Sequence, residues 1–241
     1  MRVARKGLLG LVLAGLGTAL AACSTEGPDD DKSALPAFGP VTAAAPAGGA
    51  PITDSEVLLA RLLDPADLPA GFTPSGMSRS ADLPLGDPPP TRPAGCEKVM
   101  TPIGEQRPEA PAWNFIGYNG PNFSSIDIDA ASYPADQLGP AFAAVQQTLR
   151  GCTSYSGTDA DKTTIDFRLG SLEQPAAGDA ATSFQLRTTS AGVTLLTLVS
   201  LVQVGNTLTQ VAVTAPDAVD PGVLTAVTAA QVRRLRGVAG P

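Results

Sequence analysis

The sequence predicts one α+β domain over residues 52–241, built as an antiparallel β-sheet with helices packed on one face. Three features lead to this expectation: apolar segments of strand length, short Gly-containing turns between them, and two amphipathic helices, one of which closes the chain. Helices separated by antiparallel hairpins are typical of this fold class. About 190 residues are enough for a single sizeable core.

The domain is expected to begin with a short helix. Thr53-Asp54-Ser55-Glu56 has the pattern of a capping box, in which side chains satisfy the free N–H groups of a first helical turn. Apolar residues then follow on one face up to Leu63, and Asp64-Pro65 ends the helix. A Pro-rich loop follows, with one strand expected near residues 71–73.

Two longer helices are predicted from the spacing of their apolar residues. In residues 135–150 the large apolar side chains from Leu138 to Leu149 fall on one stripe, at spacings of four, three and four. Residues 219–238 form the closing helix, because Pro221 suits its first turn and three arginines lie near its C-terminus, where the helix dipole favours cations.

The remaining apolar segments predict strands. Asn119-Gly120-Pro121-Asn122 and Gly205-Asn206 are turn signals that join the strands on either side as hairpins. The other expected strands span residues 113–118, 125–133, 163–169, 181–189, 193–204 and 207–214.

The N-terminus has the features of an exported lipoprotein. Three basic residues precede an apolar run from Gly7 to Ala19, which is short for a membrane span of about 20 residues. Leu20-Ala21-Ala22-Cys23 resembles the lipobox of bacterial lipoproteins, where cleavage precedes the cysteine and its sulfur receives a diacylglycerol. We expect residues 1–22 to be a signal peptide and the diacylglycerol and acyl (palmitate) groups on Cys23 to anchor the protein. An uncleaved anchor with a chance cysteine is the alternative.

Residues 23–51 are expected to be the lipidated cysteine and a disordered tether. They are rich in Pro, Ala and Gly and show no hydrophobic period. Such a composition cannot bury enough apolar surface to fold alone.

Composition excludes several classes of function. The chain contains no histidine, which excludes Ser-His-Asp and Cys-His catalysis and sites in which histidine ligates zinc or haem. Three of the 16 basic residues leave with the signal while all 23 acidic residues remain, so the mature chain has a net charge of −10. Such a chain is repelled by nucleic acids and anionic lipids. The bias towards Ala, Arg, Asp, Gly and Pro suggests a GC-rich genome, as in actinobacteria.

Two cysteines remain once Cys23 is acylated. Cys96 and Cys152 belong to an exported domain, where two cysteines usually pair. No C-x-x-C motif is present to activate either thiol. We predict a structural disulfide that stabilises the fold by roughly 4 kcal/mol through closure of its loop.

One group of aromatic side chains is a candidate ligand cleft. Trp113, Phe115, Tyr118 and Phe123 are the densest aromatic group in a chain with 5% aromatic residues. They are candidates to line an apolar cleft, and the alternative is that they are core residues or cross-strand pairs.

A pair of aspartates is the main candidate for catalysis. Asp127 and Asp129 share one strand face, about 7 Å apart by the strand rise, and glycosidases use two such carboxylates. Because the pair alternates with Ile126 and Ile128, we expect both carboxylates to face solvent away from the core. No serine nucleophile motif, phosphate loop or dinucleotide fingerprint is present, so we predict no catalytic residue, no cofactor and no metal site.

A series of short motifs runs through the domain, from about Ile52 to Val238. In chain order they are Leu58-Leu59 with Asp64–Phe72, Cys96, Ala143–Tyr155 with its Gly-Cys-Thr-Ser-Tyr end, Gly178-Asp179-Ala180, and Val202–Leu208. This order resembles the extracellular sensor-domain family named after a mycobacterial serine/threonine kinase, the PknH-type sensor. The resemblance implies an antiparallel sheet with helices and a cleft for an unidentified extracellular ligand. The chain departs from the family pattern by lacking a kinase domain and by allowing one disulfide where the kinase sensor has two.

Together these features predict a non-enzymatic, lipid-anchored sensor or ligand-binding lipoprotein on the extracytoplasmic face of the cell membrane. Its expected partners are the membrane, through Cys23, and an envelope ligand or protein, but no nucleic acid. The alternatives are a cell-wall hydrolase that uses Asp127 or Asp129 and a structural envelope component. Carboxylates converging in a partly buried pocket with perturbed pKa values would favour the hydrolase, whereas a structural component should have no pocket.

Overall fold

The computed structural model describes residues 34–80, 89–159, 161–216 and 218–238. The signal peptide and Cys23 lie outside these ranges, so the lipoprotein assignment stays a prediction. No helix within the described ranges is long and apolar enough to cross a membrane.

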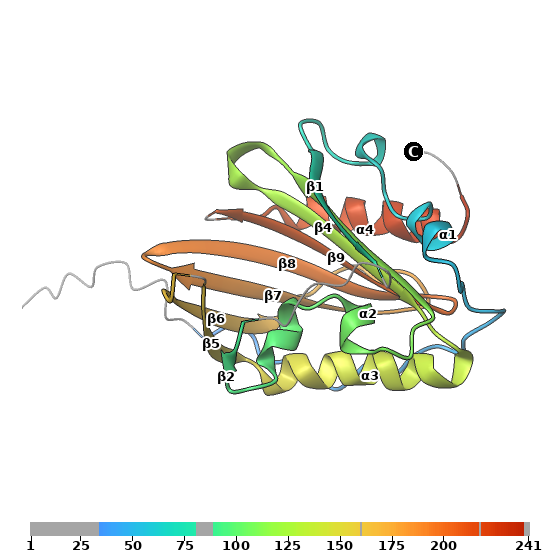
Figure 1. The fold of residues 1–241 in the computed structure, drawn as a ribbon, viewed down its shortest axis with the longest axis horizontal. Coiled ribbons are helices and arrows are strands. Elements are labelled where there is room, and N and C mark those ends of the chain that lie inside the picture. Colours follow the sequence, from blue (N-terminus) through green and yellow to red (C-terminus); the bar gives the residue numbers. More distant parts are fainter. Residues whose placement is uncertain (1–33, 81–88, 160, 217, 239–241) are drawn as a thin grey trace, which may run out of the picture. The chain divides into compact units, whose positions relative to one another are not determined.

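Nine antiparallel strands form one sheet in the order β1-β3-β4-β9-β8-β7-β6-β5-β2 (Figure 1). The centre of this sheet is built from the hairpins β3–β4 and β8–β9, which pair with each other through β4 and β9. The strands are β1 (Thr73–Ser80), β2 (Thr91–Arg92), β3 (Ala112–Asn119), β4 (Ser125–Ser132), β5 (Ser154–Thr158), β6 (Thr164–Ser171), β7 (Ala180–Ser190), β8 (Val193–Val204) and β9 (Thr207–Pro216).

Within the described part of the chain, four α-helices and three short 3₁₀ turns accompany the sheet. The α-helices are α1 (Ser55–Leu59), α2 (Ile103–Gln106), α3 (Ala135–Gly151) and α4 (Pro221–Leu235). The 3₁₀ turns are η2 (Pro65–Asp67), η3 (Cys96–Met100) and η4 (Pro121–Phe123). The predicted fold class, an antiparallel sheet with helices and one disulfide, is confirmed.

The helices cover both faces of the sheet, which corrects the expectation that they pack on one. Phe142 and Leu149 of α3 share a core with Val199 and Leu201 of β8 and with η3. Leu58 of α1 and Leu224 of α4 belong to a second core on the opposite face. Figure 1 shows α3 along one side of the sheet and α4 along the other. The central strands are therefore buried on both faces.

Element boundaries follow the sequence patterns closely where these are long. Helix α3 ends one residue after the expected 135–150, and the β8–β9 hairpin turns at Gly205-Asn206 as predicted. Helix α1 ends at Leu59, earlier than expected, and its N-cap is Asp54, whose carboxylate accepts hydrogen bonds from the N–H groups of Glu56 and Val57. Strand β5 was not expected, because Tyr155 is its only large apolar residue.

Residues 34–51 are ordered against the domain, in contrast to the disordered tether expected over residues 23–51. The main chain of Thr42 and Ala45 is hydrogen-bonded to side chains of α3 and β8, and the N–H of Ile52 donates to Ser132 Oγ. We call residues 34–47 the strap. Composition alone did not predict that the strap is ordered. Its few apolar side chains show no helical or strand periodicity, and its order depends on hydrogen bonds to distant parts of the chain.

The predicted disulfide is present between Cys96 and Cys152. It joins the first residue of η3 to the residue that follows α3, with 5.6 Å between the two Cα atoms. Both cysteines are buried in the α3-side core, together with Val99 and Leu149. The bridge therefore holds η3 against the end of α3.

Replacing both cysteines with alanine should lower the free energy of unfolding by about 4 kcal/mol, since the unfolded chain regains the freedom of a loop with a sequence separation of 56 residues. Urea unfolding of the oxidised protein and of the variant measures the difference. Two alkylatable thiols in protein taken from the cell envelope would contradict the bridge itself.

Candidate functional site

The four aromatic residues expected to line a cleft do not come together. Trp113 and Phe115 lie on the α3 side of β3, whereas Tyr118 belongs to the core on the opposite face, where its hydroxyl donates to the carbonyl of Leu63. Phe123, in η4, is 91% exposed. Alternation along one strand places odd and even residues on opposite faces, so these four side chains cannot form one cleft.

The two aspartates of β4 are not solvent-facing, contrary to the expectation. Asp129 is only 5% exposed, and its Oδ1 accepts a hydrogen bond from the N–H of Ile103 at 3.1 Å. Asp127 is half-buried and accepts a hydrogen bond from Ser125 Oγ at 3.0 Å. Both point away from Ile126 and the α4-side core, as predicted, but η3 and α2 cover the face onto which they project.

Asp127 and Asp129 line a pocket of about 220 Å³, which we call the carboxylate pocket. Its apolar wall comes mainly from β7, β8 and η3, and polar side chains of β8 and β9 lie beside the carboxylates. At one side the Arg79 guanidinium lies 5.0 Å from the centre of the Phe115 ring, and both residues line the pocket. The other polar lining residues are Thr101, Thr197, Gln210 and Thr214.

A glycine in the neighbouring strand makes room for Asp127. Gly117 of β3 is its register partner, and a Cβ at Gly117 would lie 2.9 Å from Asp127 Oδ1 and 2.9 Å from Ser75 Oγ. A larger residue would therefore displace the carboxylate. The absence of a side chain at residue 117 lets Asp127 occupy the strand face beside Phe115.

Burial dominates the electrostatics of the carboxylate pocket. It raises the pKa of the Asp129 carboxyl to about 7, against the hydrogen bond from the Ile103 N–H, while the charges of Asp127 and Glu105 add to the rise. Burial also raises the pKa of Asp127, opposed by the Ser125 hydrogen bond and the charge of Arg79. Near neutral pH the Asp129 carboxyl can therefore either donate or accept a hydrogen bond.

The described residues hold no metal centre of ordinary composition. Within these ranges, no three His, Cys, Asp or Glu side chains are grouped so that they could hold a metal ion.

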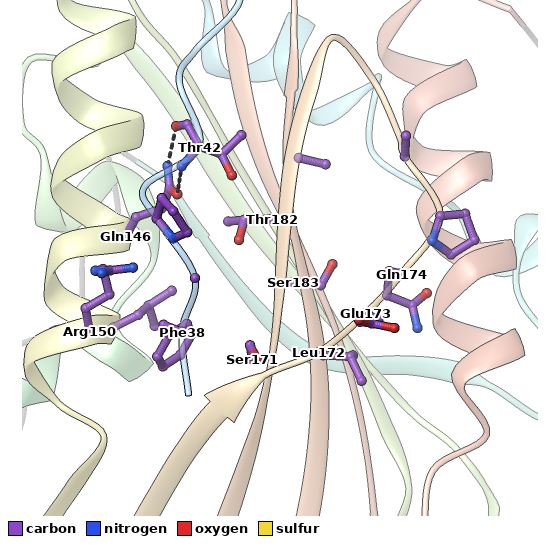
Figure 2. A pocket seen from close by; sticks show the side chains of 16 residues that line it. Phe38, Thr42, Gln146, Arg150, Ser171, Leu172, Glu173, Gln174, Thr182 and Ser183 are labelled. Atoms are coloured by element: carbon purple, nitrogen blue, oxygen red, sulfur yellow. Dashed lines mark hydrogen bonds between the residues drawn. The ribbon is translucent and has the colours of Figure 1, made fainter. Parts of the chain in front are cut away.

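A larger pocket, of about 470 Å³, lies beside the strap and is called the strap pocket. Phe38 and Thr42 of the strap, Gln146 and Arg150 of α3, and the loop after β6 form its walls. Figure 2 shows the strap running alongside α3, with Glu173 and Gln174 of the loop across from Arg150 and Phe38. Its lining combines neutral polar and apolar side chains in similar number, and its charged groups, Arg150 and Glu173, are exposed.

Sequence reasoning missed the residues that bind the strap, although one signal was available. Gln203 is the only amide side chain in the apolar strand 193–204, and Gln146 lies among the apolar residues of α3. Both are buried. A long polar side chain within an apolar stripe indicates a specific hydrogen-bonding partner, because burying it unpaired is costly.

Comparison with known proteins supports the fold but does not assign a family. No family model and no curated protein match the chain. Among solved structures, the extracellular domain of PknH from Mycobacterium tuberculosis is similar, with a TM-score of 0.60 and 14% sequence identity. The match covers 79% of this chain and 100% of the PknH domain. At this identity the similarity is one of fold.

The buried carboxyl of Asp129 predicts a specific dependence of stability on pH. Because its pKa is higher in the folded than in the unfolded protein, the folded state binds more protons between about pH 4 and pH 7, and stability falls as pH rises through this window. Asp129→Asn has no proton to lose. Relative to the wild type, it should therefore gain about 3 kcal/mol in unfolding free energy between pH 5 and pH 8.

Urea unfolding at several pH values measures this difference, with Asp166→Asn as the control on an exposed residue of β6. Asp64 and Glu97, whose pKa values are lowered by hydrogen bonds, are present in both the wild type and the variant, so their titration cancels in the difference. A stability difference between Asp129→Asn and the wild type that did not change with pH would show that Asp129 is not a buried, protonatable group.

Proposed function

We propose that the chain is a lipid-anchored, extracytoplasmic sensor-type domain that binds a small ligand in the carboxylate pocket without catalysing a reaction. The observation that carries the proposal is the placement of Asp129, a buried acid lining a concave pocket that also has apolar walls. Ligand sites commonly combine apolar walls with a few such polar groups. The fold adds support, because the similar PknH structure is an extracellular domain.

The pocket favours a small ligand with at least one hydrogen-bond donor. Its volume of about 220 Å³ lies below the usual range for drug-sized ligands. An incoming hydroxyl, amide or ammonium group can donate to the Asp129 or Asp127 carboxylate, while Phe184 and Val199 contact an apolar part of the ligand. Because the free carboxylate of Asp129 is penalised by burial, a donating ligand stabilises its ionised form.

A cell-wall hydrolase is the second candidate, and one observation favours it. Asp127 and Asp129 lie in the same pocket, and burial raises the pKa of Asp129 to about 7, as the acid of a carboxylate pair requires. Against it, the pocket is small for a glycan chain, and Asp129 is bound to the Ile103 N–H beneath α2. A purely structural envelope component is disfavoured, because such a protein is expected to have no pocket.

The lipid anchor can be tested with the mature sequence alone. The chain from Ser24 onward, exported behind an ordinary cleavable signal, should be released from membranes. It lacks Cys23, is acidic, and has no helix in its described ranges that could span a membrane. Fractionation followed by a salt wash measures the release. Recovery of the Cys23-less protein in the washed membrane pellet would rule out anchoring through Cys23.

The two candidate functions separate in a double variant, Asp127→Asn with Asp129→Asn. If the pocket binds a ligand, mass spectrometry of extracts should find a small molecule on wild-type protein purified from the envelope. The same molecule should be present on the Asp166→Asn control and at least ten-fold depleted on the double variant. Purified cell-wall glycans and esters should not be hydrolysed by any of the three proteins. Wild-type hydrolysis that disappears in the double variant would establish the hydrolase instead.

A further inference from the structure

The strap is held mainly through its backbone. The Thr42 N–H donates to Gln146 Oε1 at 2.8 Å, and Gln146 Nε2 donates back to the Thr42 carbonyl at 3.0 Å. Gln203 makes the same pair of bonds with Ala45, at 2.8 and 2.9 Å. The two glutamines are 4% and 0% exposed. Each buried amide thus binds the N–H and the carbonyl of one strap residue, as a neighbouring β-strand would.

The start of the strap is held by the end of β6. The Ser171 N–H donates to the carbonyl of Pro36 and Ser171 Oγ donates to that of Ala37, at 2.8 and 2.9 Å. A Cβ at Gly170 would lie 2.4 Å from Leu35 Cβ and 2.8 Å from Pro36 O. The strap can approach β6 this closely only because residue 170 has no side chain.

Side chains of the strap contribute little to its binding. Among its apolar side chains, Phe38, Ala44 and Ala47 pack against the α3-side core, and all three are only partly buried. Recognition through the main chain gives affinity without requiring a particular sequence, and side-chain pockets then supply specificity. The surface beneath the strap therefore suits extended peptides in general.

The strap also leaves part of this surface unfilled. The strap pocket, of about 470 Å³, lies directly beside Phe38, Gly39 and Pro40. Gly39 lines the pocket, and a Cβ there would have no atom within 4 Å. A longer polar side chain at this position therefore has open space at the edge of the pocket, where Arg150 and Glu173 lie on opposite sides (Figure 2).

We propose that the groove formed by Gln146, Gln203, Gly170 and Ser171 is a docking site for an extended peptide of a partner protein, and that the strap occupies it until such a peptide displaces it. The partner segment has small residues where the strap has Ala44 and Ala47 and a longer polar side chain where it has Gly39. This proposal is independent of the ligand assigned to the carboxylate pocket.

Displacement is physically reasonable because no residue of the strap is fully buried; eight of the fourteen are exposed and six are half-buried. Fixing its fourteen residues costs backbone entropy, which is offset by a few hydrogen bonds and by three apolar side chains packed against the α3-side core. Its connection to the domain at Ile52 gives it a high effective concentration in the groove. A partner peptide therefore gains access by making contacts that the strap lacks, above all in the strap pocket.

The test weakens the strap without altering the groove. Thr42→Pro with Ala45→Pro removes the two N–H groups that donate to Gln146 and Gln203. Ala43→Pro is the matched control, because its N–H donates no hydrogen bond within the described ranges. A fluorescent peptide of strap residues 34–47 should bind the double variant at least ten-fold more tightly than the wild type or the control, measured by fluorescence anisotropy.

Two further variants test the groove and the pocket. Adding Gly170→Ala to the double variant should abolish peptide binding, whereas adding Gly151→Ala, where a Cβ meets nothing within 4 Å, should not. A peptide carrying Gly39→Gln should bind more tightly than the parent peptide, because its side chain enters the strap pocket.

Hydrogen exchange of residues 34–47, measured on the same proteins, shows whether the strap leaves the groove. Rapid exchange of the strap in the double variant without peptide binding would overturn the proposal. Strap exchange that occurs only with global unfolding, even in the double variant, would also overturn it, because the strap would then be a permanent part of the fold. Weaker binding of the Gly39→Gln peptide would exclude the strap pocket from the docking site.

Discussion

The structure depends on the burial of its central strands, β4, β9 and β8, on both faces of the sheet. Ile128 and Val211 pack beneath α4 and α1, while Leu208 and Leu201 pack beneath α3. Where a strand is buried on both faces, a polar side chain has no access to solvent and requires a partner within the protein. The positions of both candidate sites follow from this constraint.

Two buried polar side chains in these strands lie at the candidate sites. Asp129 lies at the carboxylate pocket, and Gln203 lies beneath the strap. Asp129 accepts a hydrogen bond from the Ile103 N–H, which fixes the start of α2 over the strand, next to the lining residues Thr101 and Pro102 of the carboxylate pocket. Gln203 binds both main-chain groups of Ala45, which holds the strap against the domain. In both cases the cost of leaving a buried polar group unpaired determines where an irregular segment docks.

The sequence predicted the helices and hairpins whose formation depends on local residue patterns. The stripe from Leu138 to Leu149 predicted α3 to within one residue, and the turn at Gly205-Asn206 predicted the β8–β9 hairpin. The alternation around Ile126 also gave the correct direction for Asp127 and Asp129, but not their burial. Predicting their burial requires knowing that a second layer, built from η3 and α2, covers the face onto which the two carboxylates project. Neither segment has a strong helical pattern, and the hydrogen bonds that place the strap join residues more than 100 positions apart.

The disulfide connects the covers of the two sites. Cys96 begins η3, whose Val99 and Met100 line the carboxylate pocket. Cys152 follows α3, whose Gln146 and Arg150 line the strap pocket. The two elements, η3 and α3, have different hydrogen-bonding partners, but the disulfide fixes the start of η3 to the end of α3 within the same core. One covalent link near the end of α3 thus constrains the walls of both pockets, so a movement of η3 over the carboxylates must carry the end of α3 with it or be resisted by it.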